Sequence, residues 1–134
     1  MSSRGSKAQN GHVTTTEYKM KTPSSYVYDA KILVGTSSKN HGLPDYSHTP
    51  KSKYIKENPN GSFREMRIYG EHGEPLLEIG YHPEPHLTGN RHEYVLHYHT
   101  FKSNLERVMG GKISETENSE IYDEYKKYLK RYGL

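Results

Sequence analysis

The chain lacks cysteine and tryptophan and contains only two phenylalanines. Without cysteine it can form no disulfide framework, no thiolate metal site and no cysteine nucleophile. No apolar run approaches the ~18 residues of a membrane-spanning helix. The opening MSSRGSKAQNGH contains no apolar segment of the kind found in secretory signals. We therefore expect a cytoplasmic protein without membrane association.

Large apolar side chains are also scarce. Leu, Ile, Val and Phe together account for 22 of the 134 residues, which is below the ~20 % usual for a packed domain. Disorder of the whole chain does not follow, because the net charge is only +3. Tyrosine, with 13 residues, supplies much of what can be buried. The composition predicts one small tyrosine-rich domain with long polar extensions, and the pI near 8.9 permits a polyanionic partner.

Two parts of the chain differ in what they can bury. Residues 1–25 are mostly Ser, Thr, Lys and Gly, so we expect a flexible polar arm that is disordered in isolation and that a protein partner could order. Residues 26–134 are expected to form a single small domain. Within it, residues 35–51 contain several glycines and prolines and predict a long loop.

Strand patterns, rich in β-branched and aromatic residues, recur through the domain. They cover residues 26–34, Lys53–Glu57, Ser62–Tyr69, Leu76–His82 and His92–Phe101. Turn sequences at Asn60-Gly61 and Glu71–Pro75 join the middle strands into a meander. Two prolines make Pro83–Arg91 a stiff loop, and Gly110-Gly111 makes Lys102–Glu117 a turn or linker.

The last segment, Asn118–Tyr132, has the period of an amphipathic helix. Its apolar stripe contains Ile121, Tyr125, Tyr128, Leu129 and Tyr132. Asn118 or Ser119 is expected to cap its N-terminus. The predicted fold is α+β: a four- or five-stranded, mostly antiparallel meander with this helix across one face.

Histidine is unusually frequent, with nine residues in the chain. Five lie within 18 residues: His82, His86, His92, His97 and His99. Because side chains alternate between the faces of a strand, His97 and His99 should lie on one face, roughly 6–7 Å apart. Tyr98 should lie on the opposite face, towards the core.

Acid–base catalysis is the first interpretation of this cluster. One imidazole can accept a proton while another donates one, because the unperturbed pKa of histidine, about 6.5, lies near neutrality. Paired histidines suit metal-independent RNA cleavage, in which the 2′-hydroxyl attacks and no cofactor is needed. The expected catalytic residues are His97, His99 and His82. The residues expected to bind substrate are Arg64, Arg67, Arg91, His86 and His92.

Two other interpretations remain open for the same residues. A His-x-His pair on a strand can present two nitrogens to Zn²⁺, with His82, His86 or Glu84 as a third ligand. Alternatively, these are polar side chains on an exposed sheet face.

Several sequence runs resemble a known group of proteins. They are Leu43–His48 (LPDYSH), Arg64–Tyr69 (REMRIY), Leu77–Ile79, Tyr81–Pro85 (YHPEP) and His97–His99. These runs resemble small proteins and C-terminal modules encoded beside head genes in phages and prophages of Gram-positive bacteria. Those modules are similar to toxin-like nucleases grouped with barnase, EndoU, colicin RNases and RelE. The resemblance implies a helix packed on an antiparallel sheet and metal-independent ribonuclease activity.

The leading hypothesis is therefore a phage or mobile-element ribonuclease that acts on RNA in the cytoplasm of a bacterial host cell. A non-catalytic inhibitor that binds a host defence or nucleoprotein complex is the alternative from a different class. A zinc-binding module is the third.

Overall fold

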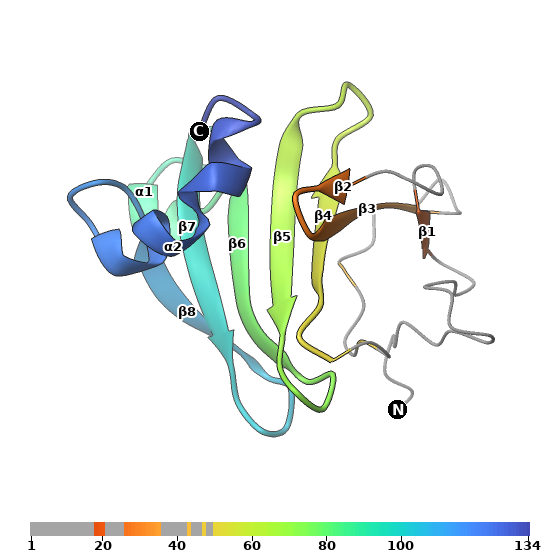
Figure 1. The fold of residues 1–134 in the computed structure, drawn as a ribbon. Coiled ribbons are helices and arrows are strands. Elements are labelled where there is room, and N and C mark those ends of the chain that lie inside the picture. The colour runs from red at the N-terminus through yellow and green to blue at the C-terminus, as the bar shows by residue number, and fades with distance from the viewer. Residues whose placement is uncertain (1–17, 21–25, 36–42, 44–46, 48–49) are drawn as a thin grey trace.

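A computed structural model describes residues 18–20, 26–35, 43, 47 and 50–134. Within these residues the chain forms one sheet of eight strands and two helices (Figure 1). The strands are β1 (Tyr18–Met20), β2 (Tyr26–Val27), β3 (Ala30–Gly35), β4 (Lys53–Glu57), β5 (Phe63–Tyr69), β6 (Pro75–Pro83), β7 (Tyr94–Phe101) and β8 (Arg107–Lys112). The helices are α1 (Pro85–Thr88) and α2 (Ser119–Lys130).

The sheet is largely a meander. Its strand order is β1-β3-β4-β5-β6-β7-β8, and β2 pairs with β3 beside this path. Only β3 and β4 pair in parallel; every other pair is antiparallel. Consecutive antiparallel strands need only short turns, and the Asn60-Gly61 and Glu71–Pro75 sequences supply two of them. Gly73, with a φ of +77°, lies so close to the carbonyl oxygen of Ser47 that no larger residue would fit.

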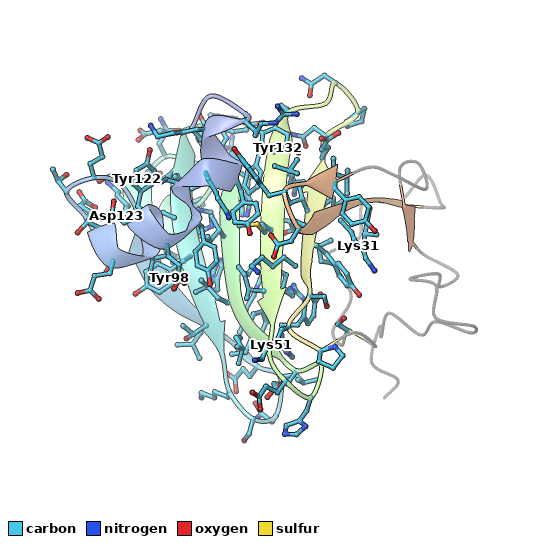
Figure 2. The ribbon with its side chains drawn as sticks, in the orientation of Figure 1. Lys31, Lys51, Tyr98, Tyr122, Asp123 and Tyr132 are labelled. Atoms are coloured by element: carbon cyan, nitrogen blue, oxygen red, sulfur yellow. The ribbon has the colours of Figure 1, made fainter. Side chains whose placement is uncertain are left out.

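The main core lies between α2 and one face of the sheet. Ile55, Met66 and Ile79 project from the central strands and are fully buried. Tyr122, Tyr128 and Leu129 meet them from α2. Tyr98 packs against this core from the sheet face that carries α2, and Figure 2 shows Asp123 pointing away from the sheet. The predicted helical stripe is confirmed, and Tyr122 extends it on one side.

The opposite face carries a smaller apolar cluster and many polar groups. Leu33, Leu43, Tyr54 and Tyr69 form the cluster, and the rings of Tyr54 and Tyr69 lie 5.0 Å apart. The polar or charged residues buried on this face or beside it are Ser47, Lys56, Glu65, Arg67, Glu78, His97 and His99. This is unusual, because charged residues are seldom buried unless they are paired.

The predicted α+β class and C-terminal helix are confirmed, but the strand count was too low. The strand predicted over residues 26–34 is divided into β2 and β3 by a turn in which Tyr28 has a φ of +55°. Strand β1 lies within the expected arm, whose remaining residues fall outside the described part of the chain. Most of the loop expected over residues 35–51 also falls outside it.

Two local predictions were wrong, and a third is confirmed in position only. Residues 107–112 form strand β8 rather than a turn or linker, because Gly110 and Gly111 adopt extended backbone. The expected stiff loop after β6 contains the short helix α1. Asn118 is the N-cap residue of α2, as predicted, but its side chain donates to the carbonyl oxygen of Lys112 at 2.7 Å and makes no capping hydrogen bond. In the part of the chain that the structure describes, no helix is long and apolar enough to cross a membrane.

Candidate metal centre

Strands β6 and β7 bring three imidazoles together on the face opposite α2. The ring centroids of His97 and His99 lie 5.1 Å apart, and those of His82 and His97 lie 4.6 Å apart. Strand alternation produces this arrangement, since His82 pairs with Val95 and Tyr98 packs against the core on the other face. The prediction that His97 and His99 lie on one face, opposite Tyr98, is confirmed.

The turn after β6 adds a carboxylate to this group. Pro83 ends β6 and Pro85 begins α1, so the backbone on both sides of Glu84 is restricted. The Glu84 side chain also accepts a hydrogen bond from the backbone N–H of His86 at 3.2 Å. One potential ligand atom from each of Glu84, His97 and His99 lies within 4.8 Å of the other two. Among the described residues, no other group of histidines and carboxylates is this close.

Backbone carbonyls fix the tautomer of two imidazoles. His97 donates from Nδ1 to the carbonyl oxygen of Val95 at 2.8 Å, and His82 donates from Nδ1 to that of Pro83 at 3.1 Å. In each neutral ring the proton is therefore on Nδ1, and Nε2 carries a lone pair. The Nε2 atom of His97 is buried and has no hydrogen-bond partner among the described residues. A lone pair left in this way is available to a cation.

The environment keeps His97 and His99 neutral at pH 7. Burial lowers the pKa of His97, whose side chain is fully buried. Burial and, after it, the positive charge of Arg107 lower the pKa of His99 to about 4. Neutral imidazole is the form that binds metal ions. An imidazole that acts as a general acid must instead be protonated before it reacts.

A glycine makes room for the three rings. Gly80 pairs with Glu65 on one side and with His97 on the other. A Cβ atom at this position would lie 2.8 Å from Nε2 of His82 and 3.4 Å from Cε1 of His97. The absence of a side chain at Gly80 therefore lets the imidazoles approach one another over the middle of the sheet.

A buried ion-pair network adjoins the imidazoles. The carboxylate of Glu78 accepts from Arg67 at 2.7 Å and from Arg107 at 3.2 Å. Glu78 pairs with Arg67 on β5 and with His99 on β7. The guanidinium of Arg67 also donates to the carbonyl oxygen of Leu43 at 3.1 Å. These contacts satisfy charges that would otherwise be costly to bury.

The pKa values of two carboxyl groups in this network are shifted in opposite directions. Burial and the nearby Glu78 raise the pKa of Glu65 to about 7. Burial also opposes ionisation of Glu78, but the charges of Arg67 and Arg107 and a hydrogen bond with Glu65 outweigh it and lower the pKa of Glu78. Glu78 is therefore the ionised member of the pair, and Glu65 holds a proton up to neutral pH.

The residues expected to bind substrate do not converge on the imidazoles. Arg67 reaches this face, but it is buried and paired with Glu78. Arg64 lies half-buried on β5, and His86 is exposed on α1. Arg91 and His92 are exposed in the turn before β7, where they contact each other.

Two contributors to this region were not identified from the sequence. Arg107 lies on β8, in the segment expected to be a turn or linker, so strand alternation could not be applied to it. Glu65 lies far from the histidines of this cluster in the sequence, and only the sheet register places it beside Gly80. Glu84 was considered among the alternative zinc ligands, and the structure places it with His97 and His99.

Comparisons with family models, with curated proteins and with solved structures gave no match. The resemblance to phage nucleases therefore stays a prediction.

Proposed function

We propose that this protein is a zinc-dependent hydrolase in which His97, His99 and Glu84 bind the metal ion. The observation that carries the proposal is the convergence of one ligand atom from each of these residues within 4.8 Å. Ligand atoms around a tetrahedral zinc ion lie about 3.3 Å apart, given bond lengths of about 2.0–2.1 Å. A contraction of at most about 1.5 Å between side chains would therefore close the site around the ion.

The chemistry of the donors supports zinc in particular. Two neutral imidazoles and one carboxylate are a common ligand set for this metal. The hydrogen bond from His97 Nδ1 to the Val95 carbonyl is of the kind that orients metal-binding histidines. The buried, unpartnered Nε2 of the same ring gains a partner when a cation binds.

Hydrolysis follows from the number of ligands. Three protein ligands leave a fourth position for water, which is the arrangement of catalytic rather than structural zinc sites. Zinc lowers the pKa of a bound water to about 7 and so supplies a nucleophile at neutral pH. Both Glu84 and the adjacent His82 are only partly buried, so the site has an open side towards solvent.

The test is hydrolysis by purified protein that has been stripped with EDTA and then supplied with Zn²⁺. Labelled RNA and a chromogenic carboxylic ester, p-nitrophenyl acetate, are suitable substrates. We expect activity that is lost on stripping, restored by zinc and abolished by His97→Gln. His92→Gln is the matched control, because His92 is exposed and lies outside the cluster. No zinc-restored hydrolysis of either substrate would contradict the proposal.

Metal-independent RNA cleavage by paired histidines is the second candidate. The contact of His82 with His97 and of His97 with His99 favours it, since acid–base catalysis needs two such groups side by side. RNA cleavage that persists in EDTA and is lost in both His97→Ala and His99→Ala would favour this reaction over the zinc-dependent one. Its rate would be bell-shaped in pH.

A further inference from the structure

We propose that Arg107 is the substrate-binding cation of this site and that the substrate carries a phosphate group. The inference rests on the proposed function, because the zinc ion and Arg107 would bind the same ligand. Arg107 begins β8, a strand that the sequence did not predict.

The sheet places Arg107 beside the imidazoles. Its backbone lies in β8, yet its Nη1 atom donates to Glu78 in β6. Strand β7 separates these two strands, and His99 in β7 pairs with Glu78. The side chain of Arg107 therefore crosses β7 next to His99, on the face that carries the cluster.

Arg107 is positioned but still available. Its side chain is 51 % exposed, and Glu78 is its one ion-pair partner in the part of the chain that the structure describes. The same carboxylate also holds Arg67, so one negative charge is shared between two guanidinium groups. Arg67, in contrast, is 5 % exposed. Of these two guanidinium groups, that of Arg107 is the one that a ligand from solvent can reach.

The geometry favours phosphate over carboxylate. A guanidinium fork engages two oxygens of an anion at once. A metal ion held by His97, His99 and Glu84 would take a further oxygen from the same group. A carboxylate has two oxygens, whereas a phosphate group presents more and spreads them tetrahedrally. A ligand that reaches both cations is therefore a phosphate or a phosphate ester.

The experiment measures binding of inorganic phosphate by calorimetry, to zinc-loaded and to EDTA-stripped protein, with acetate as the competing carboxylate probe. We expect Arg107→Gln to bind phosphate about 10–100-fold more weakly, the usual value of hydrogen bonds to a charged group, without change in zinc content. Arg107→Lys should fall between this variant and the wild type, because it keeps the charge and loses the fork. Arg91→Gln, which removes an exposed cation outside the cluster, should bind as the wild type does.

Each result separates the two proposals. If the wild type takes up no zinc, the proposed function fails, while a phosphate affinity that still depends on Arg107 supports this inference. If zinc binds but phosphate affinity is the same in Arg107→Gln and the wild type, the inference is wrong and the metal site stands. Equal losses in Arg107→Gln and Arg91→Gln, or acetate bound as tightly as phosphate, would also overturn it. Thermal unfolding shows whether each variant is folded. If Arg107→Gln is not folded, the phosphate affinity of Arg107→Lys tests the inference in its place.

Discussion

His97 donates its Nδ1 proton to the carbonyl oxygen of Val95, two residues earlier on the same strand, at 2.8 Å. The ring of His97 lies on the face opposite α2 and bonds to a backbone carbonyl of its own strand, β7. It sets the tautomer of His97 and leaves Nε2 as a lone pair in a buried position. The zinc-dependent account depends on this arrangement.

The first prediction concerns this tautomer. Nitrogen-15 chemical shifts should show His97 as a neutral ring with its proton on Nδ1 at pH 7 in metal-free protein. Burial lowers the pKa of His97, so the ring should stay neutral below pH 6.5, the unperturbed pKa of histidine. A charged His97 at pH 7, or a proton on Nε2, would contradict the arrangement.

The second prediction is that two buried groups have opposite effects on stability between pH 4.5 and 6.5. The pKa of His99 is lowered from 6.5 to about 4 in the folded state, so folding gains stability as pH rises through this range. The pKa of Glu65 is raised from 4.5 to about 7, so its contribution to stability is lost as pH rises. Burial lowers the pKa of His97 in the same direction as that of His99. In EDTA-treated wild-type protein, the free energy of unfolding in urea should therefore rise with pH by less than the two histidines alone would give.

Single variants should separate the two effects. Glu65→Gln removes the contribution that decreases as pH rises. The unfolding free energy of this variant should therefore rise more steeply from pH 4.5 to 6.5 than that of the wild type. His99→Gln removes a contribution that increases with pH. The unfolding free energy of this variant should therefore rise less with pH than that of the wild type. Parallel profiles for all three proteins would show that neither pKa is shifted.

The third prediction tests the packing of α2. Tyr128 is 3 % exposed, and its hydroxyl donates to Asp29. Tyr128→Ala should cost about 3–5 kcal/mol of unfolding free energy, as other large aromatic truncations in cores do. Tyr94→Ala is the control, because Tyr94 is 54 % exposed and should cost clearly less. A loss below about half a kcal/mol at Tyr128 would show that α2 is peripheral to the fold.

The fourth prediction uses neighbouring glycines in β8. A Cβ atom on Gly110 would lie 2.2 Å from the ring of Tyr98, whereas one on Gly111 would meet only the Nδ2 atom of Asn118, at 3.3 Å. Gly110→Ala should therefore destabilise the fold by about 1–3 kcal/mol, the usual cost of overpacking. Gly111→Ala should cost less. Equal melting temperatures for the two variants would contradict the close packing of Tyr98 on β8.

The order of the central strands follows from local sequence. Strand β4 has the predicted bounds, Lys53–Glu57, and β5, β6 and β7 differ from theirs by one or two residues at either end. Alternating apolar residues and turn sequences are local signals, so they could be interpreted without knowing the rest of the fold. The same alternation correctly placed His97 and His99 together.

Strand β8 shows where local signals are insufficient. Gly110-Gly111 is typical of a turn, but here the missing side chain gives the ring of Tyr98 a place to pack. Because that requirement comes from another strand, the segment itself does not indicate it. The contact of Arg107 with Glu78, 29 residues apart in sequence, was unpredictable for the same reason.

The measurement that tests the central claim most directly is zinc binding by the purified chain. Metal analysis after dialysis against a zinc buffer should give one zinc ion per chain for the wild type and for His92→Gln. His97→Gln and Glu84→Gln should bind zinc at least ~10–100-fold more weakly, the cost of losing even an outer-shell partner. Wild-type protein that takes up no zinc, or His97→Gln protein that binds it as tightly as the wild type, would contradict the account.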